Sequence, residues 1–190
     1  RVIVDTDSVD IAKIARENGA EVPFLRPAEL AQDASQVIDN IIYTLNKLKE
    51  EEGYDPTHVF ILQTTSPLRE VEDIDKCWDL MQRSNATTVL TVCSTHPRLY
   101  HLTEDNDIVL VNGTEAASTN IQDWPPGYIL NGCFVYIIET KVLLKEQRVI
   151  TQKTKAVVCD KWRSVDLDTP EEWVLAEFLY QNKLHPPKCL

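Results

Sequence analysis

Apolar and polar residues alternate in blocks along the first half of the chain, and the blocks predict strands that alternate with helices. Apolar residues fall at helical spacing in residues 8–19 and 35–53, and both stretches end at a glycine, as helices often do. Residues 70–85 predict another helix, with acidic residues in its first turns. Short apolar runs predict strands at residues 1–5, 21–25, 57–62 and 87–93. This order predicts an α/β fold, with a largely parallel sheet covered by helices on both faces.

The regular alternation of strands and helices ends after Cys93. Residues 99–112 alternate like a β-hairpin, with polar residues at its turn, and residues 128–138 form an apolar strand that is interrupted at Asn131–Gly132. The remaining elements are two short strands and a closing helix, expected at residues 155–160, 163–168 and 169–183. Since the sequence shows neither an internal repeat nor a linker, a single domain over residues 1–190 is predicted.

The charge of the chain excludes some classes of partner. A net charge of −11 argues against an electrostatic grip on nucleic acid or on an anionic membrane, because both need a basic face. It does not exclude a small anionic ligand, which needs only a local cluster of arginines, backbone N–H groups or a metal ion. No apolar run approaches the ~18 residues of a membrane span, and no signal peptide is recognised, so a cytoplasmic protein is expected.

The cysteines agree with a reducing compartment. None of the five belongs to a CxxC pair, and three lie in apolar stretches that predict strands, so buried free thiols are expected. They are Cys77, Cys93, Cys133, Cys159 and Cys189.

Two carboxylates in the segment SVDLDTPEEW are candidates for metal binding. On a strand, alternate residues share a face, so Asp166 and Asp168 would point the same way and repel each other unless a cation lay between them. Mg²⁺ prefers one or two carboxylates together with phosphate oxygens. Thr169 to Glu172 then predict a capping box with proline at the first helical position. The alternative is that Asp168 is only a turn residue.

The stretch ILQTTSPLRE, residues 61–70, places polar residues where a buried strand is expected to end. Gln63 leaves the strand, the residues after it supply hydroxyl and N–H groups, and Arg69 adds a positive charge just before the next helix. Such a loop suits a polar or anionic ligand. A turn that merely caps the helix explains the same residues equally well.

Two further positions allow both a structural and a ligand-binding interpretation. Arg26 ends a predicted strand, and taken alone it favours a surface salt bridge to Glu29 over an anion contact. Asn131–Gly132 between apolar runs is typical of a hairpin turn, but a glycine also allows the backbone to approach a ligand closely. Asp33 or Ser35 is expected to cap the following helix.

Taken in order, five segments resemble one family. VIVDTD, EVPFLRPAELAQD, FILQTTSPLRE, DWPPGYILNG and SVDLDTPEEW follow one another as in the CMP-sialic acid synthetases, also called acylneuraminate cytidylyltransferases. The resemblance covers almost all of the chain, and its RPAELA-x-D and LQ-x-TSPLR segments are specific to this family and its near relatives.

The resemblance implies a Rossmann-like, three-layer nucleotide-diphospho-sugar transferase fold and a Mg²⁺-dependent reaction. The anomeric hydroxyl of a nonulosonic (sialic-type) acid would attack the α-phosphate of CTP, giving the CMP-sugar and pyrophosphate. Asp166 and Asp168 would hold Mg²⁺, and Gln63 would contact the sugar acid. Further residues would serve the nucleotide (Arg26 and the helix start near Ser35) or shape the sugar pocket (Arg69, Asn131 and Gly132). Residues 97–127 would form the dimerisation excursion of a homodimer.

Some positions differ from the family pattern and suggest alternatives. Thr64 replaces a proline, while Asn120 and Ile121 stand where arginines for the sugar carboxylate are expected, and Tyr136 lies one position beyond the expected tyrosine. Legionaminic or pseudaminic acid is therefore an alternative substrate. The chain contains no GxGxxG or GxxxxGK motif, and the family's Arg-x-Gly-Ser-Lys type loop is expected before Arg1. A non-catalytic relative or fragment is the second hypothesis.

Overall fold

Two compact units make up the structure, a computed structural model that describes residues 1–32, 35–111, 120–132 and 134–182. The first unit comprises Arg1–Thr57 and Thr140–Val149, and the second comprises His58–Glu139 and Ile150–Leu190. The single domain expected from the sequence stays a prediction.

The first unit is mainly helical. Its elements are α1 (Val9–Glu17), the 3₁₀ helix η1 (Ala28–Leu30), α2 (Val37–Glu52) and α4 (Thr140–Glu146). The helix predicted over residues 8–19 is confirmed, and the hydroxyl of Ser8 caps it by accepting a hydrogen bond from the N–H of Ile11. The helix predicted over residues 35–53 is confirmed as α2, which ends at Gly53 in the left-handed conformation.

The two strands predicted in the first unit are reduced to one parallel bridge, between Ile3 and Glu21. Two backbone hydrogen bonds join these segments, from Val4 N–H to the Glu21 carbonyl and from Glu21 N–H to the Val2 carbonyl. Pro23 has no N–H with which to continue a ladder, which explains why the bridge does not extend.

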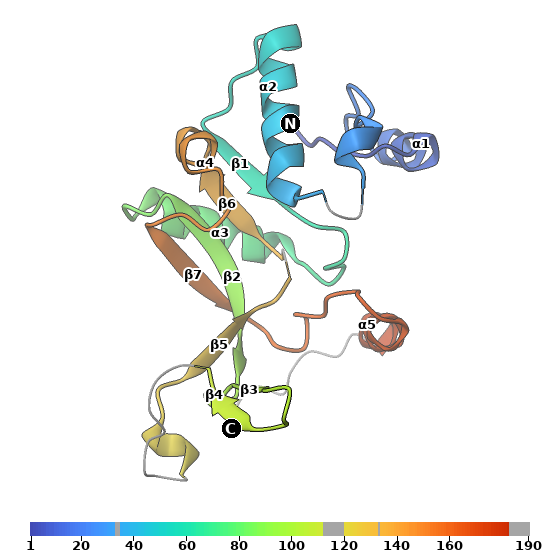
Figure 1. The fold of residues 1–190 in the computed structure, drawn as a ribbon. Helices are drawn as coiled ribbons and strands as arrows, with labels where there is room; N and C mark the ends of the chain where they lie inside the picture. Colours follow the sequence, from blue (N-terminus) through green and yellow to red (C-terminus); the bar gives the residue numbers. More distant parts are fainter. Residues whose placement is uncertain (33–34, 112–119, 133, 183–190) are drawn as a thin grey trace. The chain divides into compact units, whose positions relative to one another are not determined.

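The second unit contains the main sheet. Its strands are ordered β1 (His58–Ile61), β6 (Tyr136–Glu139), β2 (Thr88–Thr95) and β5 (Gly127–Leu130), and β7 (Thr154–Cys159) also pairs with β2. Figure 1 shows β2 as a long strand, with β1 separated from it by β6. The unit also contains α3, η2 and α5, which span Val71–Gln82, Ile121–Asp123 and Pro170–Asn182.

The prediction of a mostly parallel sheet is wrong for the described strands. Among them β7 runs parallel to β2, whereas β1–β6, β2–β5 and β2–β6 are antiparallel. The reason is that β5 and β6 follow one another along the chain and both run antiparallel to β2, each beside a different part of it. Leu130 pairs with Val92 and Tyr136 with Leu90, so only Thr91 lies between the two paired stretches of β2. The Asn131–Gly132 step is therefore a break within one line of pairing and not a hairpin turn.

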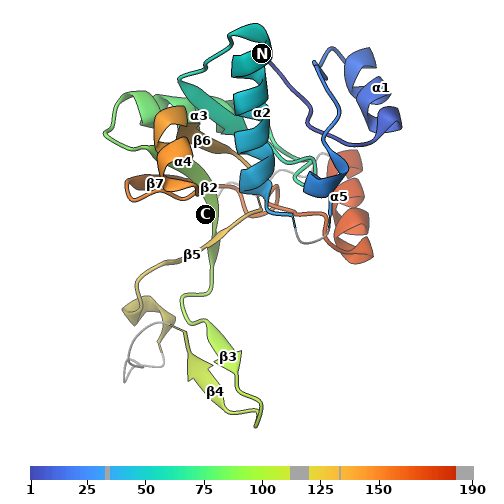
Figure 2. The same cartoon turned by 45° about the horizontal axis from the view of Figure 1, so that its top comes forward.

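The predicted hairpin is confirmed as β3 (Tyr100–Leu102) and β4 (Ile108–Leu110), which form a separate two-stranded sheet. Asn106 takes the left-handed conformation in its turn. Figure 2 shows this hairpin at the end of β2 and β5 that is remote from β1. Residues 112–119 of the proposed dimerisation excursion lie outside the described residues.

The strand predicted over residues 163–168 is absent from the described structure. Its backbone hydrogen bonds are used locally or by a loop, because Ser164 N–H donates to the Asp160 carbonyl and Leu167 N–H donates to the Thr65 carbonyl. The helix that follows, α5, begins with the predicted capping box. Thr169 Oγ1 accepts from the N–H of Glu172, and Glu172 Oε2 accepts from the N–H of Thr169.

The core of the second unit lies between α3 and the sheet. Its buried residues come from α3, β2, the approach to β6 and β7, and include Cys77, Met81, Val89, Phe134 and Cys159. Burial raises the pKa of both the Cys77 and the Cys159 thiols to about 12, so both are protonated at neutral pH.

Among the described residues no helix is long and apolar enough to cross a bilayer.

A buried ion pair closes this core. Asp73 is 1% exposed, and Arg163 donates to its two carboxylate oxygens at 2.5 and 2.9 Å. The same carboxylate accepts from the N–H of Glu70 at 2.9 Å and from the thiol of Cys159 at 3.7 Å. Burial alone would raise the pKa of Asp73, but the hydrogen bonds from Arg163 and Glu70 outweigh it, and the net pKa is lowered.

We expect Arg163→Ala to lower the free energy of unfolding by about 3–5 kcal/mol, because it leaves the Asp73 carboxylate buried and unpaired. Urea denaturation at neutral pH measures the change. Lys161→Ala is the control, since Lys161 is exposed in the same connection, and it should change stability by less than about 0.5 kcal/mol.

The pH dependence gives this prediction a second readout. A lowered folded-state pKa means that the pair contributes fully above the ordinary pKa of aspartate, near 4, and that the contribution is lost as the pH falls through the lower folded value. The difference between Arg163→Ala and the parent protein should therefore shrink in acid. A difference that stays constant below pH 4 would contradict the assignment to this pair.

Candidate functional site

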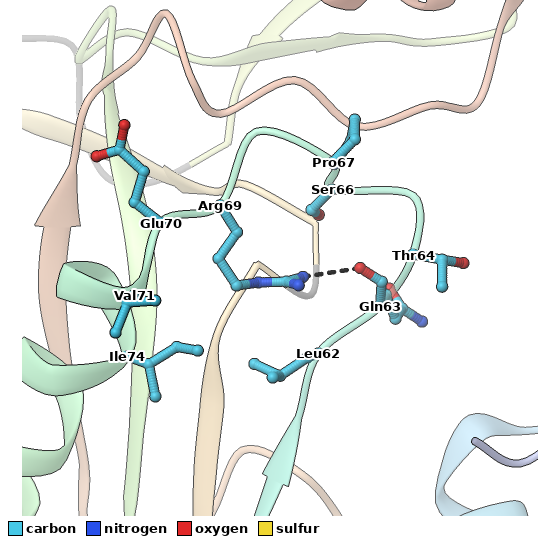
Figure 3. A pocket seen from close by; sticks show the side chains of 9 residues that line it. All are labelled: Leu62, Gln63, Thr64, Ser66, Pro67, Arg69, Glu70, Val71 and Ile74. Carbon is cyan, nitrogen blue, oxygen red and sulfur yellow. Dashed lines mark hydrogen bonds between the residues drawn. The ribbon is translucent and has the colours of Figure 1, made fainter. Parts of the chain in front are cut away.

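A shallow cavity lies at the end of β1 and in front of α3. Its volume is about 370 Å³. Gln63 and Arg69, both predicted from the sequence to serve a ligand, belong to its wall (Figure 3). The full lining is Leu62, Gln63, Thr64, Ser66, Pro67, Arg69, Glu70, Val71 and Ile74. The structure thus brings seven of the ten residues of the ILQTTSPLRE stretch around one hollow.

Arg69 organises the wall of this cavity. Its Nη2 donates to the Gln63 carbonyl at 2.7 Å, the contact drawn in Figure 3, and its Nε donates to the Phe134 carbonyl. The guanidinium also lies over the Phe134 ring, 5.6 Å from its centroid. Arg69 therefore joins the loop that holds Gln63 to the segment that enters β6, a role that the sequence prediction of a pocket cation did not include.

Ser66 supplies an unused polar group at the cavity. The residue is 1% exposed, and its hydroxyl has no hydrogen-bond partner within the described part of the chain. A buried hydroxyl without a partner costs free energy, and a bound polar ligand can offset that cost. Gln63 is only half-buried, so its amide is accessible from the same hollow.

The Asn131–Gly132 step lies against the carboxylate of Asp166. Asn131 is 3% exposed, and its amide bonds Thr91 Oγ1 at 3.0 Å and Ser164 Oγ at 3.0 Å. Gly132 has a φ of 65°, and Asp166 occupies the space beside its Cα. The structure thus brings together three of the predicted site residues, although Asn131 uses its amide inside the protein.

Asp166 and Asp168 differ in environment. Since residues 163–168 do not form a strand, the sequence argument that both carboxylates share one face does not hold. Asp166 is half-buried and its Oδ1 is a buried atom without a hydrogen-bond partner among the described residues, whereas Asp168 is exposed. The Asp168 N–H donates to Glu172 Oε2 at 2.9 Å, which holds this residue at the start of α5.

The carboxylate of Asp166 is a group of the chemical kind that Mg²⁺ binds in proteins. In the described part of the chain no group of three or more His, Cys, Asp or Glu side chains could hold a metal. Mg²⁺ does not need such a group, because it keeps waters and binds through one or two carboxylates together with phosphate oxygens. The unpartnered Oδ1 of Asp166 supplies an oxygen of the required kind.

Arg26 and Ser35 lie in the first unit. Arg26 forms a salt bridge at 3.1 Å with Asp5, which corrects the expected partner Glu29, and its Nη2 also donates to the Asp5 carbonyl. Ser35 does not cap α2, because Gln36 is the N-cap residue and makes no side-chain capping bond. The Ser35 hydroxyl instead accepts from the N–H of Gln32 at 3.1 Å. Asp33, the other expected cap, lies outside the described residues.

Comparison with known sequences decides the family. A CMP-N,N'-diacetyllegionaminic acid synthase from Legionella pneumophila is 30% identical over 182 residues, which cover 95% of this chain and 78% of that protein. The chain belongs to the acylneuraminate cytidylyltransferase family. No family model matches the sequence. An N-acylneuraminate cytidylyltransferase from Streptococcus agalactiae serotype V is 25% identical over 175 residues, covering 91% of this chain and 41% of that protein.

Solved structures agree with an α/β nucleotidyltransferase fold. CMP:2-keto-3-deoxy-manno-octonic acid synthetase complexed with CTP superposes with a TM-score of 0.65 at 12% identity, covering 97% of this chain and 82% of that one. At this identity the likeness concerns the fold, and it confirms the α/β class.

Sequence analysis of this family member missed the roles of Arg163 and Phe134. The Phe134 ring is buried, with the guanidinium of Arg69 at 5.6 Å and that of Arg163 at 6.0 Å from its centroid. Arg163 also donates to the Leu68 carbonyl, in the same loop as Gln63. The spacing of Glu70 and Asp73, which form a capping box at the start of α3, was the one signal for this network in the sequence.

We expect Arg69→Leu to destabilise the protein by about 1–3 kcal/mol, because the carbonyls of Gln63 and Phe134 would each lose a hydrogen bond from its guanidinium. The Gln63 carbonyl would keep only the longer bond from the N–H of Ser66, at 3.4 Å. Urea denaturation measures the loss, and Arg83→Leu, at the exposed end of α3, is the control. Equal stability of the two variants would show that the bonds to these carbonyls are dispensable.

Proposed function

We propose that the protein transfers CMP from CTP to a nonulosonic acid and releases pyrophosphate. The observation that carries the proposal is the 30% identity, over almost the whole chain, to an enzyme named as a CMP-N,N'-diacetyllegionaminic acid synthase. The solved structure with a similar fold is described as a complex with CTP, which supports the nucleotide. For the sugar acid we propose the hollow at the end of β1, whose wall includes Gln63 and Arg69.

In this reaction the oxygen of the anomeric hydroxyl attacks the α-phosphorus of CTP. A new P–O bond forms, the bond between the α-phosphorus and the bridging oxygen breaks, the electron pair leaves with pyrophosphate, and the hydroxyl proton passes to solvent or to a base. Catalysis of such a transfer rests on positioning and on charge neutralisation. Bound Mg²⁺ would offset the negative charge of the triphosphate oxygens.

The residues divide between these tasks. Asp166 and Asp168 would hold the metal ion, and Gln63 would orient the sugar acid from the wall of the cavity. The buried hydroxyl of Ser66 offers a second hydrogen bond in the same hollow. Arg26 and the segment around Ser35 are proposed for the nucleotide because the RPAELA-x-D segment occupies that place in the family.

A legionaminic-type acid is the proposed substrate. The relative at 30% identity is named for N,N'-diacetyllegionaminic acid, whereas the N-acylneuraminate enzyme is 25% identical. The residues at positions 120 and 121, Asn and Ile, also differ from the arginines expected for sialic acid. A panel of legionaminic, pseudaminic and sialic acids separates these substrates.

Pyrophosphate release from CTP and Mg²⁺ by the full protein tests the proposal. We expect turnover with at least one acid of the panel and the highest kcat/KM with a legionaminic acid. If none of these acids is converted, the hypothesis of a non-catalytic relative replaces the proposed cytidylyltransferase function.

Asp168→Asn tests the metal carboxylates. It should lower kcat by about 10-fold or more without unfolding the protein. Removing a residue that only hydrogen-bonds a metal ligand already costs about 10–100-fold in metal affinity or activity. Glu171→Gln is the control, because Glu171 is an exposed carboxylate in the first turn of α5. Wild-type rates in Asp168→Asn would mean that this aspartate is only a turn residue.

A homodimer that uses the β3–β4 hairpin is the proposed assembly. A two-stranded hairpin is marginally stable in water on its own, so it needs a surface on which to pack. Leu102 is 65% exposed and Ile108 is 67% exposed, and these two residues pair across the hairpin. Exposed apolar side chains that lie next to each other are typical of an interaction surface.

We expect the double substitution Leu102→Asp and Ile108→Asp to convert the dimer to a monomer, because two carboxylates would have to be desolvated in the interface. Light scattering after size exclusion measures the mass. Glu104→Gln, in the exposed turn of the same hairpin, should leave it unchanged. A parent protein that is monomeric at micromolar concentration would rule out this assembly.

A reducing compartment, the cytoplasm, is the proposed location. Cys77, Cys93 and Cys159 are free and buried among the described residues. Proteins with buried free thiols are typical of reducing compartments.

A further inference from the structure

The backbone at Gly132 leaves no room for a side chain. A Cβ atom built there would lie 2.4 Å from Asp166 Oδ2, 2.6 Å from its Cγ and 2.8 Å from its Oδ1. Real Cβ atoms do not approach other atoms so closely, so any side chain at position 132 would displace the Asp166 carboxyl group. The missing side chain of Gly132 is thus what makes space for this carboxylate.

Two other glycines with a positive φ lack this crowding, whereas a Cβ atom at Gly127 would be crowded by the backbone of His96 and Pro97. Gly53 has a φ of 67°, close to the 65° of Gly132, and Gly19 has a φ of 85°. A Cβ atom at either of them would meet nothing within 4 Å. All three need glycine for their backbone conformation, but among these three Gly132 is the one that also needs glycine for a neighbour.

Asn131 fixes the position of the same segment. Its amide oxygen accepts from Thr91 Oγ1 of β2, and its amide nitrogen donates to Ser164 Oγ, two residues before Asp166. Ser164 Oγ in turn donates to the Asp160 carbonyl at 2.7 Å. The Asn131 side chain therefore ties the connection that carries Asp166 to the central strand.

We infer that Asn131 and Gly132 are positioning residues for the carboxylate of Asp166 and do not contact the sugar acid. Asn131 holds the segment around Ser164, and Gly132 leaves the space in which the carboxylate lies. Among the described residues the buried Oδ1 of Asp166 then has no hydrogen-bond partner, and we assign this oxygen to the metal ion. The inference about the metal rests on the proposed function, whereas the contact between Gly132 and Asp166 does not.

A double-mutant cycle tests the contact without any activity measurement. Gly132→Ala should lower Tm by at least about 4 °C more than Gly53→Ala does. Gly53→Ala is the control, because it introduces the same backbone strain without the collision. In an Asp166→Ala background this excess should disappear, because the carboxylate is gone. An excess that persists in that background overturns the inference. If Gly132→Ala folds only together with Asp166→Ala the inference is supported, and if it folds in neither background it is overturned.

Metal binding tests the consequence for the site. Paramagnetic resonance of Mn²⁺, titrated with and without CTP, should show at least about tenfold weaker binding to Gly132→Ala and to Ser164→Ala than to the parent and to Gly53→Ala. The Mg²⁺ concentration for half-maximal turnover should rise in the same two variants, while the KM for the sugar acid changes less. Unchanged Mn²⁺ binding with a raised KM for the sugar acid would mean that Gly132 faces the substrate.

The two experiments separate this inference from the proposed function. If the parent protein shows no cytidylyl transfer, the proposed function fails, but the double-mutant cycle still reports whether Gly132 makes space for Asp166. If transfer is observed and the cycle shows no coupling, the function stands and the positioning role fails.

Discussion

Asp73 carries a carboxylate into the core of the second unit, and Arg163 neutralises it through two hydrogen bonds. Three segments depend on this pair, and one of them is distant in the sequence from the other two. Asp73 belongs to α3, Arg163 to the connection between β7 and α5, and the Leu68 carbonyl bonded by Arg163 to the loop after β1. Without the pair a charge would be left in a low-dielectric interior, so the packing of these segments is conditional on it.

The candidate site is built on top of this network. Arg69 and Arg163 lie on the ring of Phe134, and both reach backbone carbonyls of the loop that bears Gln63. The loop is further joined to the Asp166 segment by the bond from Leu167 N–H to the Thr65 carbonyl. Hydrogen bonds from Arg69, Arg163 and Leu167 thus connect the loop of the proposed sugar contact with the segment of the proposed metal carboxylates.

The helices could be predicted from the sequence because their information is local. The apolar spacing and the terminal Gly53 were sufficient for α2, and Thr169 to Glu172 were sufficient for the start of α5. The hairpin of β3 and β4 was predicted for the same reason, since its two strands are adjacent in the sequence.

What could not be predicted depends on pairing between distant segments. The direction of β6 beside β1 and β2 follows from the break at Asn131–Gly132, whose short sequence is equally typical of a hairpin turn. Of the candidate site, Gln63 and Arg69 both line the cavity, and their roles toward a ligand stay predictions. The bonds from Arg69 to backbone carbonyls could not be predicted, because these carbonyls are not visible in a sequence. The same holds for Asp73, whose partner lies 90 residues away.

The close approach of Gly132 to Asp166 gives this position two separate reasons to be glycine. A side chain at position 132 would meet the carboxyl group of Asp166, which would have to move aside for it. Because the φ of Gly132 is 65°, another residue there would be strained even after that movement. Replacing Asp166 alone would therefore remove only one of the two reasons.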